Sequence, residues 1–444
     1  MPIEFRLRDF AYPVSIFRLR RFLEESQWKP LDELIGYQEE LLRRVIPQAC
    51  YHVPYYRRLF DAHRLKPRDI RKTDDLVRIP FLTREDVREK YEQLRADNAK
   101  RFRPVEAFTT GTTGTPLKVL VDRPSNILEF AYYWRHWSWG GYRLGDPFAE
   151  LRWDYFRRRP ETNETLYKYQ APFRRLLLNS ISLSRERIGE YAAAIRKYRP
   201  KFIHGRPSNL YCLALFLRDG SFDDISFRAV FTAGEVVLPE HREMIEKTFH
   251  CKVLDHYAHM ERCMAVTQCL HGGYHINLEY GILQLTEQRK LDDGVIIGRT
   301  VCTSLHKMSM PFLRYKIEDV LEVFPAQRRC PCGRTLPLVK AVHGRVRPII
   351  MSPDGRPITT LAAPFQSVKG VRAFQFVHEE PARIVVRVVR GEEYTQGTEE
   401  TLKLGLRKFI GEGMNIDLYC VTEDSLERDE WGNAQMFVSR VQPR

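Results

Sequence analysis

The stretch IGEYAAAIRKYRPKFIHG, residues 188–205, contains the two patterns that decide the fold class. Its apolar residues recur at spacings of three and four, which predicts an amphipathic helix. These residues are Ile188, Tyr191, Ala192 and Ile195. The run KFIHG that follows, residues 201–205, is typical of a buried strand. Because similar alternation continues from about residue 102 to residue 304, the sequence predicts an α/β domain with layered sheets.

Two later segments repeat the change from strand to turn. RAVFTAGE, residues 228–235, is typical of a buried strand that opens into a turn at Gly234. CKVLDHYAHME, residues 251–261, shows the same pattern and ends at Glu261. Ligands of layered α/β sheets collect at the carboxyl ends of strands. We therefore expect both turns to lie at a binding site.

The order of the predicted elements changes near residue 342. Segments then follow in the order strand, strand, helix and strand, at residues 372–377, 382–390, 402–410 and 415–421. This order predicts a small α+β domain after the large one. We place the first domain at residues 1–343 and the second at residues 344–444, with a candidate linker at residues 344–348.

Composition limits the classes of ligand and location. The chain has 444 residues, 43% of them hydrophobic, which is enough for a large domain and a smaller one. Lysine and arginine total 71 against 57 acidic residues, and the net charge of +14 favours anions such as nucleotides, acidic glycans, CoA-like thiols or anionic lipids. Residues 1–23 include five arginines and no unbroken apolar stretch, so we predict neither a signal peptide nor a membrane span. Nine cysteines without a secretion signal favour thiols and a metal site over disulfides, and a cytoplasmic protein is expected.

The threonine segment, defined as residues 109–115 within AFTTGTTGTPLKVL, is a candidate phosphate site. Gly111 and Gly114 permit backbone conformations that expose N–H groups, and the threonine hydroxyls add further donors. The segment lacks the G-x-x-x-x-G-K-[ST] spacing of a Walker loop. From these residues alone, phosphate binding and an ordinary flexible turn are equally good interpretations.

Several segments occur in an order that resembles the adenylate-forming (acyl-CoA synthetase-like) superfamily, and more closely its phenylacetate-CoA ligase-like branch, which includes capsular polysaccharide biosynthesis proteins. They are TTGTTGTPL (109–117), FTAGEVV (231–237), DHYAHMER (255–262), FLRYKIEDV (312–320) and VHGRVRP (342–348), supported by YHVPYYRRLF (51–60) and HGRPSNLYCLA (204–214). The resemblance implies a large adenylation domain that binds nucleotide and substrate. It also implies a small C-terminal lid domain that swings between two reaction steps.

The resemblance assigns roles around ATP and Mg²⁺. Glu261 matches an acid that helps to hold Mg²⁺, a hard cation that prefers oxygen ligands. Asp319 matches an aspartate whose two oxygens accept both ribose hydroxyls, and Tyr257 would stack on the adenine. The implied nucleotide-binding set is Thr109, Thr110, Gly111, Thr112, Thr113, Gly114, Gly234, Glu235, Asp255, His256, Tyr257, Asp319 and Arg345. Without the resemblance, Glu261 would be a solvated carboxylate at a helix start, Asp319 a turn or cap residue and Tyr257 a core aromatic.

Two further residues are candidates for the chemistry beside Glu261. His259 has an ordinary pKa near neutrality, so it could act as a general base or orient the carboxylate substrate. A structural hydrogen-bonding histidine is the commoner alternative. Thr115 replaces the lysine of the family's phosphate-binding segment, and Lys118 is a nearby cation that could reach a phosphate. The catalytic candidates are therefore Glu261, His259 and Lys118.

Cysteine and histidine spacing suggests a metal site. Cys269 and His275 are six residues apart, and Cys330 and Cys332 flank a proline in CPCGR. Three thiolates and an imidazole form a tetrahedral zinc set of the Cys₃His type. Because the C-x-C spacing is shorter than the usual C-x₂-C, buried free thiols are the alternative. Related ligase-like proteins carry cysteines and a histidine at similar places, which favours a structural zinc site, and His271 is an alternative nitrogen ligand.

The C-terminal segment departs from the family pattern. Adenylating members carry a Gly-Lys pair whose lysine bridges the carboxylate substrate and the α-phosphate. Here WGNAQMFVSR, residues 431–440, has Asn433 at that position. An amide has no charge to stabilise developing negative charge, so adenylation should be impaired. Arg440 and Arg444 are the candidates for a substitute cation.

The sequence therefore predicts an ATP-dependent ligase that activates a carboxylic acid as an acyl-adenylate, with aromatic acids among the candidates. The acyl group would pass to CoA or to another thiol, amine or hydroxyl, with ATP, Mg²⁺ and structural Zn²⁺ as cofactors. The alternative is a non-adenylating relative that binds nucleotide or transfers an acyl group made elsewhere. Nucleic-acid binding rests only on charge and arginine runs such as residues 157–159, without a recognisable module. Capsule biosynthesis is the pathway that the resemblance suggests, and a homodimer is the commonest closed assembly.

Overall fold

The computed structural model describes residues 13–108, 117–156, 165–343, 350–351, 357–358, 361, 364–366, 368, 370–410, 413–428 and 434–441. The threonine segment, the candidate linker, residues 157–159, Asn433 and Arg444 lie outside these ranges. The chain packs as two compact units. The first unit comprises Met1–Thr109, Leu117–Leu144 and Leu254–Gly344, and the second comprises Thr110–Pro116, Gly145–Val253 and Arg345–Arg444. The domain boundary predicted at residue 343 stays a prediction.

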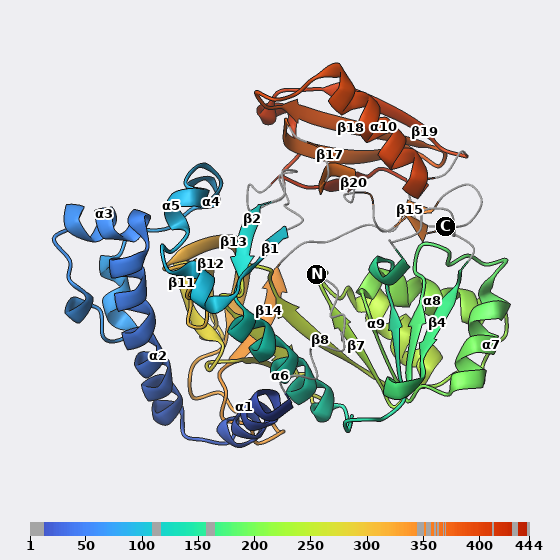
Figure 1. Cartoon of the computed structure of the whole chain (residues 1–444). Coiled ribbons are helices and arrows are strands. Elements are labelled where there is room, and N and C mark those ends of the chain that lie inside the picture. Colours follow the sequence, from blue (N-terminus) through green and yellow to red (C-terminus); the bar gives the residue numbers. More distant parts are fainter. Residues whose placement is uncertain are drawn as a thin grey trace. The chain divides into compact units, whose positions relative to one another are not determined.

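The first unit begins with helices. They are α1 (Pro13–Ser26), α2 (Leu31–His52), α3 (Pro54–Ala62), α4 (Arg84–Glu89), α5 (Tyr91–Leu94) and α6 (Arg123–Trp139), with 3₁₀ helices at Pro67–Asp69, Asp74–Arg78 and Ala99–Phe102 (Figure 1). In α2, apolar side chains at helical spacing, among them Leu41, Leu42 and Val45, are buried. The helix ends where Val53 adopts an extended conformation before Pro54, because a residue before proline disfavours the helical region.

Antiparallel strands make up the rest of the first unit. They are β1 (Val105–Phe108) paired with β2 (Lys118–Val121), and β8 (Lys252–Ala258), β9 (Ala265–Gln268), β10 (Tyr274–Ile276), β11 (Gly281–Lys290), β12 (Ile296–Ser304), β13 (Tyr315–Val323) and β14 (Leu338–His343). The latter strands belong to the large mixed sheet and follow the order β11-β12-β13-β14-β10-β9-β8. The segment FLRYKIEDV thus enters β13, between β12 and β14.

The pairing of β12 with β13 is irregular beside Asp319. Arg299 pairs with Val320 and Val301 pairs with Lys316, so one residue of β12 lies opposite three residues of β13. Such a bulge bends a strand and redirects its side chains. Asp319 is therefore a bulge residue within a strand, and the alternative of a turn or cap residue is wrong.

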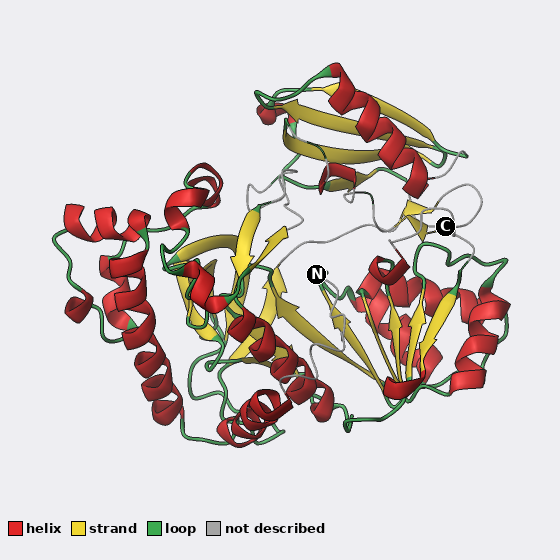
Figure 2. Ribbon diagram, in the orientation of Figure 1, coloured by secondary structure: helices red, strands yellow, loops and turns green. Residues whose placement is uncertain are grey.

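The second unit contains the strands and helices that the opening stretch predicts. They are β3 (Phe148–Leu151), β4 (Tyr167–Gln170), β5 (Arg175–Leu178), α7 (Ile188–Tyr198), β6 (Phe202–Gly205), α8 (Pro207–Asp219), β7 (Ala229–Ala233) and α9 (Pro239–Phe249), with 3₁₀ helices at Asp154–Phe156 and Ala171–Phe173. The strands follow the order β7-β6-β3-β5-β4, and only β4 pairs antiparallel among these strands (Figure 2). One apolar core cluster joins side chains of α7, α8 and these strands, including Tyr191, Ile203 and Leu213. The α/β prediction for this region is confirmed.

The C-terminal part of the second unit forms a small sheet with one helix packed on it. Its elements are β17 (Val371–Glu380), β18 (Arg383–Arg390), α10 (Gln396–Ile410), β19 (Asn415–Cys420) and β20 (Phe437–Ser439), with short strands β15 (Ile350–Met351) and β16 (Pro357–Ile358) and 3₁₀ helices at Pro364–Gln366 and Glu423–Ser425. The sheet order is β19-β18-β17-β20. Phe374, Phe376, Leu402 and Leu406 belong to its apolar core. The predicted order of strand, strand, helix and strand is confirmed.

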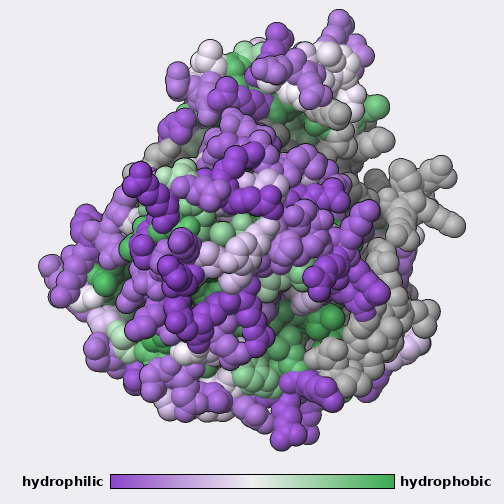
Figure 3. All heavy atoms as spheres, turned by 60° about the vertical axis from the view of Figure 1, so that its left-hand side comes forward, coloured by the Kyte–Doolittle hydropathy of each residue, from purple (hydrophilic) through white to green (hydrophobic). Residues whose placement is uncertain are grey.

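Hydrophilic residues dominate the face drawn in Figure 3, with smaller hydrophobic areas between them. Among the described residues, no helix combines the length and the apolar character needed to cross a bilayer.

Candidate active site and metal centre

The loop between β8 and β9 brings the predicted magnesium ligand into the interior of the first unit. The two strands pair antiparallel up to Ala258 and Ala265, which leaves a short connection that contains His259 and Glu261. Arg262 has a φ of 56°, a left-handed conformation that turns the chain sharply. Glu261 is only 6% exposed, so the alternative of a solvated carboxylate at a helix start is wrong.

Two side chains hold the carboxylate of Glu261. The Tyr315 hydroxyl, at the start of β13, donates a hydrogen bond to Oε1 at 3.3 Å. Nδ1 of His259 lies 3.6 Å from Oε2. Burial and the charge of Glu261 raise the pKa of Tyr315 well above its usual value, which keeps this hydroxyl a donor. Tyr315 was not among the predicted site residues, although it lies in the quoted segment FLRYKIEDV.

Asp319 and Tyr257 are in direct contact. The Tyr257 hydroxyl at the end of β8 donates a hydrogen bond to Oδ2 of Asp319 in β13 at 2.5 Å. Tyr257 is half-buried, so it is not the fully enclosed core aromatic of the alternative interpretation. The contact joins two of the residues that the resemblance assigns to the nucleotide.

His259 lies beside Glu261, and its side chain is largely buried. Burial lowers its pKa, although the negative charges of Glu261 and Asp319 oppose that shift. Its Nε2 lies 3.8 Å from Sγ of Cys302 in β12. A neutral imidazole can accept a proton, and it can also serve as a structural contact, so both interpretations of His259 remain open.

The neighbours of Tyr257 on β8 are buried. The Asp255 carboxylate accepts a hydrogen bond from the Tyr274 hydroxyl at 3.1 Å. The ring of His256 packs edge-on against Tyr133, with centroids 4.5 Å apart. Both side chains therefore have contacts within the first unit, and their predicted role in binding adenine stays a prediction.

Gly234 and Glu235 follow β7 in the second unit. Gly234 has a φ of 89°, a conformation that favours glycine. The Glu235 carboxylate accepts a hydrogen bond from the backbone N–H of Ser208 in the first turn of α8, at 3.2 Å. The guanidinium of Arg206 lies 3.9 Å from the same carboxylate. A negative charge at this helix start is favourable, so Glu235 has a structural role at the start of α8. Its role in nucleotide binding stays a prediction.

Lys118 and Arg440 both have carboxylate partners. In β2, the Lys118 ammonium lies 2.5 Å from Oε1 of Glu106 in β1 and 4.7 Å from the centre of the Tyr91 ring. The guanidinium of Arg440 is exposed and lies 2.8 Å from Glu427. The predicted role of Lys118 at a phosphate stays a prediction, and so does a role for Arg440 as a substitute cation. Predicted positions outside the described residues are Thr109, Thr110, Gly111, Thr112, Thr113, Gly114, Arg345, Asn433 and Arg444.

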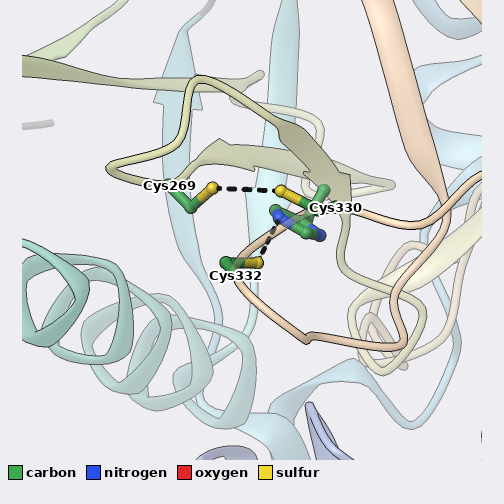
Figure 4. A group of neighbouring side chains, drawn as sticks. Cys269, Cys330 and Cys332 are labelled. Atoms are coloured by element: carbon green, nitrogen blue, oxygen red, sulfur yellow. Dashed lines mark hydrogen bonds between the residues drawn. The ribbon is translucent and has the colours of Figure 1, made fainter.

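The structure brings the four predicted metal ligands together. Cys269 follows β9, His275 lies in β10, and Cys330 and Cys332 lie in the connection from β13 to β14. Their ligand atoms all lie within 4.8 Å of one another. Sγ of Cys269 is 3.6 Å from Sγ of Cys330, and Sγ of Cys332 is 3.3 Å from Nε2 of His275 (Figure 4). His271 is exposed and does not belong to this group.

The spacing of these atoms suits a tetrahedral zinc ion. With Zn–S bonds of about 2.3 Å and Zn–N bonds of about 2.0–2.1 Å, a tetrahedron places two sulfurs about 3.8 Å apart and a sulfur and a nitrogen about 3.5 Å apart. Nδ1 of His275 faces the carbonyl oxygen of Leu336 at 3.4 Å, which leaves Nε2 for a metal. A Cβ at Gly273 would lie 2.7 Å from Sγ of Cys330, so only glycine fits beside the cluster.

The group of four candidate ligands packs against the helical part of the first unit. The His275 ring meets the Trp139 indole at the end of α6, with centroids 5.5 Å apart. The indole N–H donates to Oε1 of Gln27 at 2.8 Å, and Nε of Arg334 donates to the same oxygen at 2.7 Å. Because Gln27 follows α1, the cysteine-containing connection is tied to both helices. This arrangement favours a structural role over a catalytic one.

The chain resembles known proteins both in sequence and in structure. No family model matches the chain. Protein CapK of Staphylococcus aureus is 21% identical over 329 residues, which covers 72% of this chain and 71% of that protein. Phenylacetate-coenzyme A ligase of Thermus thermophilus is 26% identical over 364 residues, covering 74% and 73%. The enzyme of the same name from Escherichia coli is 26% identical over 345 residues, covering 73% and 74%.

A solved structure of 2-hydroxyisobutyryl-CoA ligase, with 2-HIB-AMP and CoA in the thioesterification state, has a TM-score of 0.58 and 18% identity. The match covers 93% of this chain and 91% of that chain. The same ligase in the postadenylation state with R3-HIB-AMP gives a TM-score of 0.57 at 17% identity and covers 93% and 90%. This likeness shows the fold. The chain is therefore a distant homologue of phenylacetate-coenzyme A ligases and of CapK, with the mixed α/β fold of adenylate-forming CoA ligases.

Proposed function

We propose that this chain is an ATP-dependent ligase that activates a carboxylic acid and transfers the acyl group to CoA or to another thiol, amine or hydroxyl. The contact between Tyr257 and Asp319 is the main support, because two residues assigned to the nucleotide by resemblance are hydrogen-bonded at 2.5 Å. Glu261, assigned to Mg²⁺, belongs to the same unit and is buried.

The proposed reaction has two steps. In the first, a carboxylate oxygen of the substrate attacks the α-phosphorus of ATP, the new P–O bond forms, and the bond to the β-phosphate breaks to release pyrophosphate. In the second, the acceptor thiol, amine or hydroxyl loses its proton and attacks the carbonyl carbon of the acyl-adenylate, and AMP leaves. A negative charge develops in both steps, so fixed positive charges and donors near the phosphates would promote the reaction.

Asp319, Tyr257 and His259 each have a defined role in this proposal. Asp319 accepts the ribose hydroxyls, and the Tyr257 hydroxyl fixes the orientation of its carboxylate. Tyr257 itself flanks the adenine. Neutral His259 is available to accept a proton or to hold Glu261 in place, because its pKa is lowered by burial.

The residues around Glu261 fit a magnesium ion at the phosphates. Mg²⁺ in nucleotide sites is usually held by one or two carboxylates, with phosphate oxygens and water as the other ligands. Glu261 supplies one carboxylate, whose Oε1 accepts a hydrogen bond from the Tyr315 hydroxyl at 3.3 Å and whose Oε2 lies 3.6 Å from Nδ1 of His259. When bound, the ion would neutralise charge on the phosphates.

ATP–pyrophosphate exchange across a panel of aryl, hydroxylated and short-chain carboxylic acids tests the proposal. Exchange with one class of acid would establish adenylation and identify the substrate, including whether it is aromatic. We expect Asp319→Ala to abolish exchange. Glu322→Ala is the matched control, since Glu322 lies in the same strand and pairs with His343 and Lys340. Equal loss in both variants would contradict a specific role for Asp319.

The non-adenylating relative is the second candidate function, and Asn433 is the observation that favours it. If the wild-type chain binds ATP but exchanges no pyrophosphate, while Asn433→Lys restores exchange, the chain has lost the first half-reaction. If the wild-type chain does not bind ATP at all, the ligase and the nucleotide-binding relative both fail, and transfer of an acyl group made elsewhere is the candidate that is left.

We also propose that Cys269, His275, Cys330 and Cys332 hold a structural Zn²⁺. Four converging protein ligands leave no open position for substrate, which supports a structural role. Elemental analysis of the purified chain should give about one zinc per chain. The predicted cytoplasmic location, capsule pathway and homodimer stay predictions.

A further inference from the structure

Lys307 is an unusual buried cation in the first unit. It lies in the connection between β12 and β13, in the segment LHKMSMPFL, residues 305–313. The residue is 0% exposed, and none of the described residues accepts a hydrogen bond from its Nζ. Its Nζ lies over the aromatic face of Phe312, 3.9 Å from the ring centre.

The connection around Lys307 is held rigidly by Asp122, which follows β2. The Asp122 carboxylate accepts hydrogen bonds from the backbone N–H groups of Met308 and Ser309 and from the Ser309 hydroxyl. Asp122 is itself fully buried. Because this carboxylate is engaged by the residues that follow Lys307, it fixes the backbone rather than pairing with the ammonium.

A buried ammonium without a hydrogen-bond partner is costly to the folded state, because the charge has lost its water and gained no acceptor. Burial lowers the pKa of Lys307, and negative charge at Asp122 and Glu261 opposes that shift. Cores retain such groups mainly where function requires them. The cost therefore points to a negatively charged ligand as the missing hydrogen-bond acceptor.

Packing connects Lys307 to the proposed magnesium ligand. The Phe312 ring that lies under Nζ is 4.9 Å, centre to centre, from the ring of Tyr315. The Tyr315 hydroxyl in turn donates to Glu261. Lys307, Phe312, Tyr315 and Glu261 thus form one contiguous cluster, and we call it the Lys307 cluster.

Two other cations of the first unit near the candidate residues are already paired with carboxylates. Lys118 pairs with Glu106, and Arg262 pairs with Glu129. Glu261 and Asp319 add negative charge to the same unit, so a polyphosphate would be repelled unless a positive charge outside any salt bridge lay nearby. Lys307 is a cation that meets this need, and in a low-dielectric interior it acts beyond contact distance.

We propose that Lys307 is a fixed positive charge that holds the polyphosphate of a nucleoside triphosphate beside Glu261. The inference rests on the proposed function and adds a binding and positioning residue to it. Its ligand class is a polyphosphate, which can be the intact nucleotide or free pyrophosphate.

The test compares the full-length wild type with Lys307→Met, which keeps the length of the side chain and removes its charge. Lys316→Met is the matched control, because the Lys316 ammonium also lies over a ring, 4.5 Å from the centre of Phe81, but is partly exposed. Calorimetric titration gives the affinities for ATP with Mg²⁺, pyrophosphate with Mg²⁺, adenosine and CoA. Thermal unfolding without ligand gives the stability of each variant.

We expect Lys307→Met to weaken binding of ATP and of pyrophosphate by about tenfold or more, leave adenosine binding unchanged and raise the ligand-free Tm. Lys316→Met should leave the ligand affinities unchanged. If ATP alone is weakened, the intact nucleotide is the ligand; if both are weakened, the terminal phosphates are the contact.

Three outcomes would overturn the inference. One is wild-type affinity for both polyphosphates in Lys307→Met, and another is an equal loss of adenosine binding, which indicates general disruption. The third is failure of both Lys307→Met and Lys307→Gln to fold, since the charge would then be structural. A wild-type chain that binds no ATP would instead contradict the proposed function on which the inference rests.

Discussion

The Tyr257 hydroxyl donates a hydrogen bond to Oδ2 of Asp319 at 2.5 Å and so joins the end of β8 to the bulge in β13. The bulge in β13 sets the direction in which the Asp319 side chain leaves the strand. The hydrogen bond from Tyr257 then fixes the orientation of its carboxylate. Hydrogen bonds to charged groups contribute about 1.5–3 kcal/mol, so this contact can hold a binding residue in one orientation.

Removing this hydroxyl should weaken nucleotide binding. Tyr257→Phe keeps the ring and deletes the donor, and we expect about tenfold weaker ATP binding by calorimetric titration with little change in Tm. Tyr155→Phe is the control, because its hydroxyl also donates to a carboxylate, that of Glu150 at 2.6 Å, and neither residue belongs to the predicted nucleotide-binding set. Unchanged ATP affinity in Tyr257→Phe would show that the contact does not position Asp319 for a nucleotide.

Loss of one metal ligand should release zinc and destabilise the chain. Cys330→Ala breaks the four-ligand group, so zinc content should fall from about one per chain to near zero, and the Tm should drop by several degrees. Cys212→Ala is the matched control, since Cys212 is equally buried and lies outside the group. Zinc content is measured by elemental analysis. Retention of zinc in Cys330→Ala would contradict the proposed ligand set.

The buried pair of Arg135 and Glu279 should be sensitive to loss of one partner. Both side chains are 1% exposed, and Nη1 lies 2.8 Å from Oε1. Glu279→Leu leaves an uncompensated buried guanidinium, which should lower the free energy of unfolding by about 3–5 kcal/mol in urea titrations.

Replacing both partners, as Arg135→Met with Glu279→Leu, should recover most of this stability, because no charge is then left buried alone. The exposed pair of Arg196 and Asp224 provides the control, and Asp224→Ala should change stability little. A double variant as unstable as the single one would show that the pair has a structural role that apolar side chains cannot replace.

Stability should fall as the medium becomes acidic, because buried histidines must gain a proton on unfolding. Burial lowers the pKa of His241, which packs on Tyr211 with ring centroids 4.5 Å apart. Its folded pKa lies below its unfolded value near 6.5, so its contribution is present above about pH 6.5 and is lost as pH decreases toward the folded pKa.

The measurement is the free energy of unfolding from pH 7.5 to pH 5. His241→Gln should reduce the slope of stability against pH below about pH 6.5 by up to about 1.4 kcal/mol per pH unit. His63→Gln, at an exposed position, should leave the slope unchanged. An equal effect of both variants would exclude a specific contribution from His241.

Local patterns in the sequence determined much of the architecture. Helical spacing from Ile188 to Ile195 and the run at residues 201–205 correspond to α7 and β6, because burial of an amphipathic face is encoded in local periodicity. Local patterns also predicted the order of strands and helix after residue 342. Cysteine and histidine spacing suggested the four metal ligands, because few other functions use that combination of side chains.

Tertiary structure alone decided the geometry of the candidate sites. The bulge at Asp319 depends on how β13 pairs with β12, and no local signal in RYKIEDV specifies a register with a distant strand. In the segment LHKMSMPFL, no local feature distinguishes Lys307 from an exposed lysine. In the structure it is a buried cation, because it packs against Phe312 and Asp122 anchors the residues that follow it. Sequence periodicity records which faces are apolar. It does not record which distant side chains meet, because burial and electrostatic environment are set by contacts between segments far apart in the chain.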